Sequence, residues 1–450
     1  MGLFPDGLHI CTYDVRGTLV ASGQTKPVRE TGLVTHTHQL LHGMARRHPD
    51  ARLAVTQTGA VTPQRLGELL TPEGLTVDLR TLATRFPKYL RDPRGGKSAH
   101  LVKRYYEDQI EDRTNPVWAS LAQQYAHAVN DAGIPHLLLQ NTNPLVSVLK
   151  AEEFGLMKGG LDITGVVHDT AGAEQRFGYI AQRAEHTGAG LRLIAVSDQV
   201  RQQMLTAGIP GELVRTVFNG LDVPAFEARL QQARDAHVFA RVRERNGLPA
   251  GHRIVLVSAR RVPWKGHEDV IRAAARLDER GLMDDTVVVF NGAGLLDTRR
   301  PTYEDDLNRL VAELGLAGKV VLLDELTREE VAACYTAAHV SVLASREPEP
   351  FGYANLEAML AGVPVIATGH GGPLAYIQDE VSGLLVPPNA PLAIAAAVER
   401  LLIDIPLHAR LAEAGRASAE RFTLDAMFDG YEAAISGGNV SPVAEGAGAR

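Results

Sequence analysis

The stretch from Val340 to Pro388, VSVLASREPEPFGYANLEAMLAGVPVIATGHGGPLAYIQDEVSGLLVPP, decides how the second half of this chain folds. An apolar, β-branched run at 338–343 predicts a strand, and the polar segment with two prolines that follows it predicts a loop. From Phe351 to Leu360 the apolar residues recur at helical spacing. The stretch therefore predicts a strand, a loop and a helix in succession.

The start of this helix is a candidate anion site. Pro350 is expected at the first helical position, where the missing N–H of proline would be unpaired in any case. The amides of Phe351, Gly352 and Tyr353 would then lack helical acceptors, at the positive end of the helix dipole. Because Gly352 has no side chain, a phosphate could approach the backbone closely there.

Glu349 and Glu357 bracket seven residues around this helix start. This E-x7-E pattern, followed by EAMLAGVPVIATGHGG and SGLLVPP, resembles the nucleotide-sugar site of the family 4 retaining glycosyltransferases. The resemblance implies that Glu357 binds the ribose, that Glu349 lies against the hydroxyls of the donor sugar, and that the 351–353 amides hold the diphosphate. The alternative, two solvated acids on an ordinary helix, is disfavoured by the flanking Gly-Val-Pro and Gly-Gly segments.

Two cations are expected beside this site. In HRIVLVSARRVPWKGHEDVI the strand 253–258 is followed by Arg260 and, five residues later, by Lys265. Cations at the carboxyl end of a strand can neutralise a departing diphosphate, and the spacing resembles the R-x4-K of the same family. That resemblance gives Arg260 and Lys265 the leaving-group role. Arg261 could take the place of Arg260 in the motif. The alternative role for these cations is surface salt bridging.

Length and composition set the class of protein. A chain of 450 residues exceeds one core, so two domains of roughly 200 residues each are expected. Apolar content of 45%, 22% charged residues and the lack of an apolar run of about 18 residues favour a soluble protein. The start of the chain has no signal-peptide pattern, and Cys11 and Cys334 read as reduced thiols. A cytoplasmic location follows as an expectation.

The net charge of −7 and the dispersed arginines predict neither nucleic-acid binding nor membrane insertion. The expected partners are a nucleotide-sugar donor and a small polar acceptor, and the oligomeric state is left open. No metal or other cofactor is expected. His38 and His42 have the i,i+4 spacing of a helical metal pair, but no neighbouring acid completes the set.

The first half of the chain reads as an α/β domain. A strand at 7–12, a glycine-containing loop and a helix from Val34 to Met44 place Gly32 where a ligand could meet the backbone. In the resembled family this loop faces the donor phosphates and the acceptor, usually with paired glycines. A second strand is expected at 51–59. The segment 60–125 is expected to be irregular, either a solvated loop or an acceptor-binding lid.

Polar residues follow two later strands, at 136–140 and 163–168. Carboxyl ends of parallel strands are where α/β proteins bind ligands, so Asn141 and Asn143 are weak candidates for acceptor hydroxyls. The family has a His-Asp pair in the place of VVHDTAG, which implies that His168 lies near the transferred sugar. A purely structural histidine is the alternative.

The resemblance implies the GT-B architecture, two Rossmann-like α/β domains whose parallel sheets face each other across a cleft. The expected order is an acceptor-side domain at 1–222, a linker at 223–250, a nucleotide-sugar domain at 251–420, a helix crossing back at 421–435 and a disordered tail at 436–450. The nucleotide base is expected near 323–326. One departure concerns the donor sugar, because the family commonly has an acid where this chain has Ala375.

The expected activity is retaining, metal-independent transfer of a sugar from a UDP- or GDP-sugar to a small soluble acceptor, as in secondary-metabolite or thiol-conjugate biosynthesis. No carboxylate stands out as a sugar nucleophile, so the family's front-face mechanism is expected. A phosphorylase or a nucleotide-sugar epimerase on the same fold is the alternative, as is an inactive sugar-nucleotide-binding protein. Intact Arg260, Lys265, Glu349 and Glu357 favour an enzyme.

Overall fold

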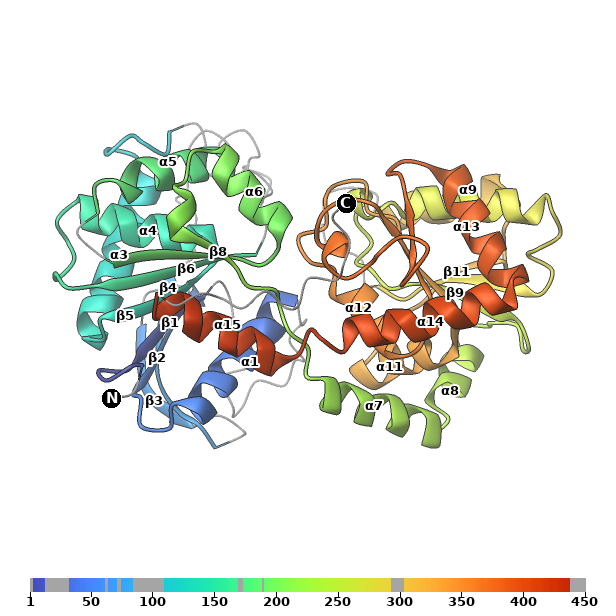
Figure 1. Ribbon diagram of the computed structural model, residues 1–450, viewed down its shortest axis with the longest axis horizontal. Coiled ribbons are helices and arrows are strands. Elements are labelled where there is room, and N and C mark those ends of the chain that lie inside the picture. Colours follow the sequence, from blue (N-terminus) through green and yellow to red (C-terminus); the bar gives the residue numbers. More distant parts are fainter. Residues whose placement is uncertain are drawn as a thin grey trace. The chain divides into compact units, whose positions relative to one another are not determined.

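The protein forms two compact α/β units. The computed structural model describes residues 3–12, 32–60, 64–70, 74–83, 109–168, 173–187, 190–292 and 303–437. Among the described residues, one unit comprises those up to Asn219 together with 424–437, and the other comprises Gly220–Thr423 (Figure 1). Most of the tail expected at 436–450, and the segment 84–108 of the expected lid, lie outside the described residues.

The first unit is built on an eight-stranded sheet in the order β3-β4-β2-β1-β5-β6-β7-β8. All neighbouring strands are parallel except β3 and β4. At its centre Ile10 pairs with Val55 on one side and Leu138 on the other, and all three are buried. The strands are β1 Leu8–Thr12, β2 Leu53–Ala60, β3 Gln64–Leu70, β4 Thr76–Ala83, β5 His136–Gln140, β6 Asp162–Val167, β7 Gly190–Ala195 and β8 Val214–Thr216.

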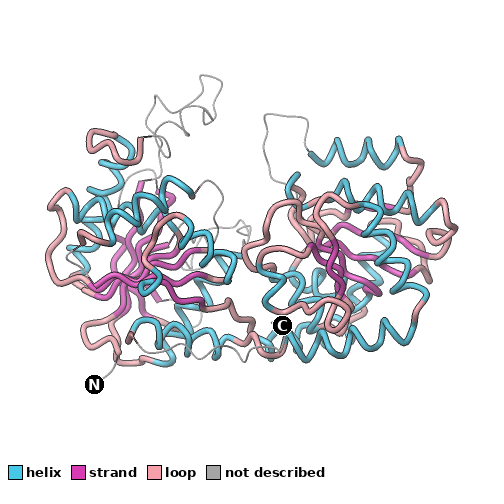
Figure 2. The backbone as a smooth tube through the Cα atoms, turned by 45° about the horizontal axis from the view of Figure 1, so that its top comes forward, coloured by secondary structure: helices cyan, strands magenta, loops and turns pink. Residues whose placement is uncertain are grey.

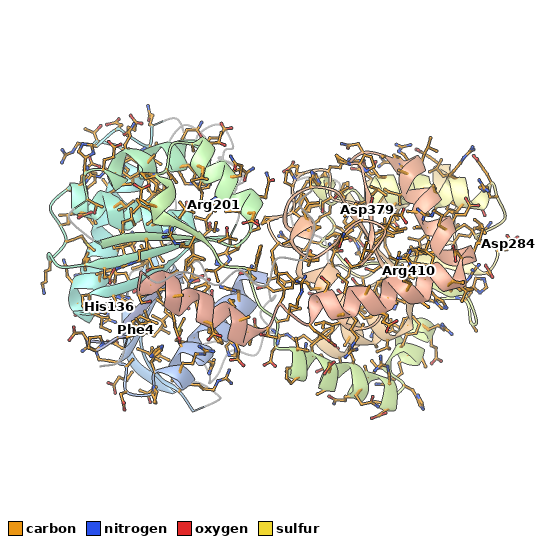
Figure 3. All side chains as sticks on the ribbon, viewed as in Figure 1. Phe4, His136, Arg201, Asp284, Asp379 and Arg410 are labelled. Carbon is orange, nitrogen blue, oxygen red and sulfur yellow. The ribbon has the colours of Figure 1, made fainter. Side chains whose placement is uncertain are left out.

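Helices cover both faces of this sheet (Figure 2). They are α1 Gly32–Arg47, α3 Pro116–Ala132, α4 Thr142–Glu153, α5 Glu174–Ala184, α6 Asp198–Thr206 and α15 Leu424–Ile435, with a 3-10 turn at Gly211–Leu213. The last helix, α15, returns from the second unit and packs on α1. Gly43 of α1 leaves room for the ring of Phe428, and Arg47 bonds Asp429 at 2.7 Å. At the amino edge of the sheet Phe4 packs edge-on against His136 (Figure 3).

Part of the segment expected to be irregular is regular. Within 60–125, the strands β3 and β4 form an antiparallel pair and α3 begins at Pro116. The charged residues of β4 made this strand hard to predict, because charged side chains usually indicate an exposed segment. Here Arg80 is buried, and its guanidinium bonds Asp131 at 2.9 Å and Asp78 at 2.8 Å. The prediction of an irregular segment is wrong over these ranges.

The second unit has a six-stranded parallel sheet in the order β11-β10-β9-β12-β13-β14. This is the strand order of a doubly wound Rossmann-like sheet, in which the direction of winding reverses between the first and fourth strands. Here the reversal lies between β9 and β12. The strands are β9 Arg253–Val257, β10 Thr286–Phe290, β11 Val320–Leu322, β12 Ala338–Leu343, β13 Val365–Thr368 and β14 Leu384–Val386.

The helices of the second unit include two, α7 and α8, that lie between the start of this unit at Gly220 and its first strand. They are α7 Val223–Asp235, α8 Val238–Arg245, α9 His267–Asp278, α10 Tyr303–Glu313, α11 Arg328–Ala337, α12 Tyr353–Leu360, α13 Pro391–Ile403 and α14 Ile405–Ala419, with 3-10 turns at Pro263–Lys265 and Gly372–Ala375. The segment 223–250, expected as a linker, is therefore part of the second unit, where Phe226 of α7 packs against Tyr335 of α11. None of the described helices is long and apolar enough to cross a membrane.

Candidate active site

The sheet of the second unit places the expected donor site at its point of reversal. In open parallel sheets, ligands bind outside the carboxyl ends of the strands at this point. The segments that leave β9 and β12 there are 258–266 and 344–352. They carry both expected cations and Glu349, and Gly266 allows them to approach each other closely. A Cβ at Gly266 would lie 1.9 Å from the carbonyl oxygen of Ala344.

Lys265 and Glu349 form a buried ion pair between these two segments. Lys265 ends the 3-10 turn Pro263–Lys265, and its Nζ donates to Oε2 of Glu349. Both side chains are about 10% exposed. Ser345 donates a second hydrogen bond to the same carboxylate oxygen, at 3.0 Å, and the Lys265 ammonium lies 4.2 Å from the ring centre of Trp264. Burial lowers the pKa of Lys265, and the Glu349 carboxylate opposes that change.

The structure separates the two candidate arginines. Arg261 is buried, donates to the carbonyl oxygens of Phe290 and Leu323, and pairs with Glu304 at 2.8 Å. Arg261 is thus engaged in holding the sheet edge. Arg260 is exposed, and no hydrogen bond or ion pair of its side chain is found within the described part of the chain. Its charge is close enough to Lys265 to lower the pKa of that ammonium.

The loop that carries Glu349 is held by the Gly-Gly segment after β13. The amide of Gly372 donates to the carbonyl of Glu349 at 2.6 Å, and a Cβ at Gly371 would lie 2.4 Å from the same carbonyl oxygen. The hydroxyl of Tyr376, which is buried, donates toward the carbonyls of Phe351 at 2.7 Å and Gly352 at 3.0 Å. The backbone conformation before α12 is therefore fixed by its neighbours.

The helix expected to open at Pro350 begins instead at Tyr353. Gly352 is its N-cap residue and has a φ of 88°, a left-handed conformation that glycine adopts without strain. A helix starting at Pro350 would require right-handed φ values through this position, so the expectation was wrong by three residues. The amino end of α12 lies directly after the Glu349 loop, and a Cβ at Gly352 would lie 3.1 Å from Cγ of Glu349.

Glu357 lies in the middle of α12 and is half-buried. Its Oε2 accepts a hydrogen bond from the hydroxyl of Tyr335 at 2.8 Å, and that hydroxyl is also 2.9 Å from Oγ of Ser258 at the end of β9. Burial raises the pKa of Glu357, while the Tyr335 hydrogen bond and the charges of Arg229 and Arg328 lower it. Nothing in the spacing of Tyr335 on an apolar helix face identifies this contact from the sequence.

The candidates in the first unit lie at the carboxyl edge of its own sheet. His168 follows β6 and donates Nε2–H to Oε1 of Gln140 at 2.7 Å. Its ring packs edge-on against His36, with centres 4.5 Å apart, and His36 in turn contacts the hydroxyl of Tyr431 on α15 at 3.2 Å. Burial lowers the pKa of both histidines, that of His36 to about 4.

The remaining candidates of the first unit are Asn141, Asn143 and Gly32, which lie at or near the starts of helices. Asn141 caps α4 through a 2.9 Å bond from the amide of Thr142, and its own φ is 79°. Asn143 accepts a hydrogen bond from Arg176 at 3.4 Å. Gly32, expected in the loop before the first helix, is the first residue of α1.

No group of three or more metal-binding side chains is found among the described residues. Asp284 and Asp285 are adjacent acids that could suggest a metal site, and they lie in the turn before β10. There Asp285 bonds Arg253 at 2.5 Å, and the exposed side chain of Asp284 lies at the periphery of the second unit (Figure 3).

Comparison with solved structures identifies the fold. Over 96% of its length the chain superposes on 99% of Anabaena HepE in complex with UDP and glucose, with a TM-score of 0.66 and 17% identity. Sucrose-phosphate synthase from Thermosynechococcus elongatus covers 94% of the chain and 96% of its own, with a TM-score of 0.65 and 20% identity. The expected GT-B fold is confirmed.

The sequence of the second unit resembles that of known glycosyltransferases. Residues 238–418 match the family described as glycosyl transferases group 1. The D-inositol 3-phosphate glycosyltransferase of Salinispora arenicola is 36% identical over 220 residues, which are 48% of each chain. The chain thus spans about half the length of the curated relatives it matches. The prediction of a family 4 type glycosyltransferase domain is confirmed.

Proposed function

We propose that this protein is a retaining glycosyltransferase that uses a nucleotide-diphosphate sugar, UDP- or GDP-linked, and a small polar acceptor. The observation that carries the proposal is the buried Lys265–Glu349 pair at the carboxyl ends of β9 and β12, with Arg260 exposed beside it. Burying a lysine and a glutamate together costs desolvation energy that apolar residues would avoid. The presence of such a pair at the carboxyl edge of the sheet therefore favours a chemical role.

In the proposed reaction the bond between the sugar's anomeric carbon and the diphosphate oxygen breaks, and negative charge grows on the leaving oxygen. Lys265 and Arg260 stabilise that charge, and the amino end of α12 adds its helix dipole. The acceptor hydroxyl attacks from the face that the diphosphate leaves, and the departing phosphate oxygen takes its proton. Glu349 lies against the sugar hydroxyls, and Glu357 accepts hydrogen bonds from the ribose.

His168 is proposed to contact the transferred sugar from the first unit, with Asn141 and Asn143 as weaker acceptor contacts. The relatives named D-inositol 3-phosphate glycosyltransferase make a polyhydroxylated acceptor with a phosphate a reasonable first choice. We propose that no metal is needed, since Lys265 and Arg260 would neutralise the diphosphate.

The test begins with thermal-shift screening against UDP, GDP, ADP and dTDP. The nucleotide that stabilises the protein then directs transfer assays with its sugar donors and with inositol 3-phosphate and other polar acceptors. Proton NMR of the product should show the anomeric configuration of the donor retained. An inverted product would exclude a retaining mechanism, and turnover only with inorganic phosphate or without any acceptor would favour a phosphorylase or an epimerase.

A further inference from the structure

Arg346 joins the two segments of the candidate site, although neither its place in the sequence nor the proposed chemistry gives it a role. It lies in the loop after β12, three residues before Glu349. Its amide donates to the carbonyl of Trp264 at 2.7 Å, next to Lys265. Its backbone therefore contacts the turn that presents Lys265.

The guanidinium of Arg346 adds three hydrogen bonds to the first turn of α9. Nε and Nη2 bond the two carboxylate oxygens of Asp269 at 2.8 and 2.9 Å, and Nη2 also bonds Glu268 at 2.7 Å. The Asp269 side chain is 6% exposed, so this fork of parallel bonds is largely shielded from water. The bonds to Asp269 and Glu268 raise the pKa of Arg346, which stays charged.

The opposite side of the same loop is bonded to β13. The carbonyl of Ser345 accepts hydrogen bonds from the hydroxyl of Thr368 and from Nε2 of His370, both at 2.9 Å. The loop is thus bonded to β13 through Ser345 and to α9 through Arg346. Loss of the Arg346 fork would leave the β13 side and the backbone bond to Trp264 in place, and would remove the side-chain bonds that hold the loop on α9.

We propose that Arg346 is a positioning residue that fixes Glu349 relative to Lys265 by clamping the loop 345–349 onto α9. The inference rests on the proposed function, because it assigns the clamp to the site where the diphosphate leaves. Arg346 itself is bound to Asp269 and Glu268 and acts through the loop. A planar, bidentate guanidinium suits this role, and a lysine could not reproduce it.

The test compares Arg346→Met with Arg346→Met combined with Asp269→Asn. The single variant leaves the buried Asp269 charge without its partner, so both Tm and kcat should fall. In the double variant that charge is gone and Tm should recover, but the loop stays unclamped and kcat should remain low. We expect kcat to fall about 10- to 100-fold in both variants, because displacing a catalytic group by about 1 Å can lower the rate by this much. The Kd for the nucleoside diphosphate should change less than about twofold.

A matched control is Arg400→Met, because Arg400 also forms a bidentate pair, with Glu380 at 2.7 and 2.8 Å, but on an exposed surface. It should leave kcat unchanged. Arg346→Lys should give an intermediate kcat. If the double variant recovers kcat together with Tm, or if Arg346→Met leaves kcat intact, Arg346 supports stability alone and the positioning role is refuted.

Amide hydrogen exchange separates this inference from the proposed function. In the full-length Arg346→Met/Asp269→Asn double variant, exchange should accelerate in 345–352 and 263–268 and stay unchanged around Arg400. This result would support the clamp even if no sugar donor were turned over by the wild type, in which case only the proposed function would fail. Unchanged exchange in 345–352 would overturn the clamp.

Discussion

Substitution of Lys265 by methionine tests the buried pair most severely. The change keeps the length of the side chain but removes the ammonium, so within the described part of the chain the Glu349 carboxylate keeps only the 3.0 Å bond from Ser345. Both side chains of the pair are about 10% exposed. Breaking a buried pair on one side costs about 3–5 kcal/mol. For a unit of this size, the Tm of the second unit should fall by roughly 6–20 °C.

The same variant should lose transfer activity for a different reason. Charge on the leaving oxygen grows in the transition state, so kcat should fall about 10²-fold or more while donor affinity falls much less. Adding Glu349→Gln to Lys265→Met removes the uncompensated charge and should restore most of the Tm, but not kcat. Calorimetry of unfolding and single-turnover kinetics with the donor give the two readouts.

A control is available in the same unit. Lys319 pairs with Asp278, but their side chains are 34% and 27% exposed. Lys319→Met should cost less than about 1 kcal/mol and leave kcat unchanged. The reasoning fails if Lys265→Met raises only the donor KM with kcat intact, or if the double variant regains activity.

Three further predictions use simpler measurements. Arg260→Ala should lower kcat by about 10²-fold or more with little change in Tm, because Arg260 is exposed, and a kcat like that of the wild type would remove it from the leaving-group role. EDTA should leave transfer intact, and restoration of a lost activity by Mg²⁺ or Mn²⁺ would show that the two cations do not suffice. Nucleotide affinity should fall on acidification as the raised pKa of Glu357 is crossed, because its carboxylate must accept ribose hydrogen bonds. Tyr335→Phe removes the bond that lowers this pKa and should move the midpoint to higher pH in titration calorimetry, whereas Tyr179→Phe, which removes a bond to Glu153 in the first unit, should not.

The strands of both sheets were predictable where apolar runs are short and bounded by turn residues. The run at 338–343 coincides with β12, and 136–140 coincides with β5. The prediction failed where an element contains charged residues, as in β4, where Arg80 is buried and paired. The start of α12 was placed too early because proline suits a first helical turn, whereas tertiary bonds from Gly372 and Tyr376 fix a different backbone there.

Within the candidate site, motif spacing singled out Arg260, Lys265 and Glu349, which the structure brings together at the carboxyl edge of the sheet. It did not predict that Lys265 and Glu349 would pair with each other, since they are 84 residues apart in the chain. The supporting contacts of Tyr335 and Arg346 were also missed. Both arise from the meeting of loops and helices distant in sequence, and a single sequence contains no periodic pattern that reports such contacts.

The division of the donor between Glu349 and Glu357 is the central claim of the proposed site. Glu357 is assigned to ribose hydroxyls, which do not change during the reaction, so Glu357→Ala should weaken binding of the bare nucleoside diphosphate and of the donor alike. A lost charge-assisted hydrogen bond predicts about 1.5–3 kcal/mol. Glu349 is assigned to the sugar, so Glu349→Ala should damage transfer.

The most direct measurement is titration calorimetry of both variants with the nucleoside diphosphate alone. We expect a Kd about 10- to 150-fold weaker for Glu357→Ala, the equivalent of that energy, and a Kd close to that of the wild type for Glu349→Ala. Equal weakening in the two variants would contradict the assignment of the ribose to one acid and the sugar to the other.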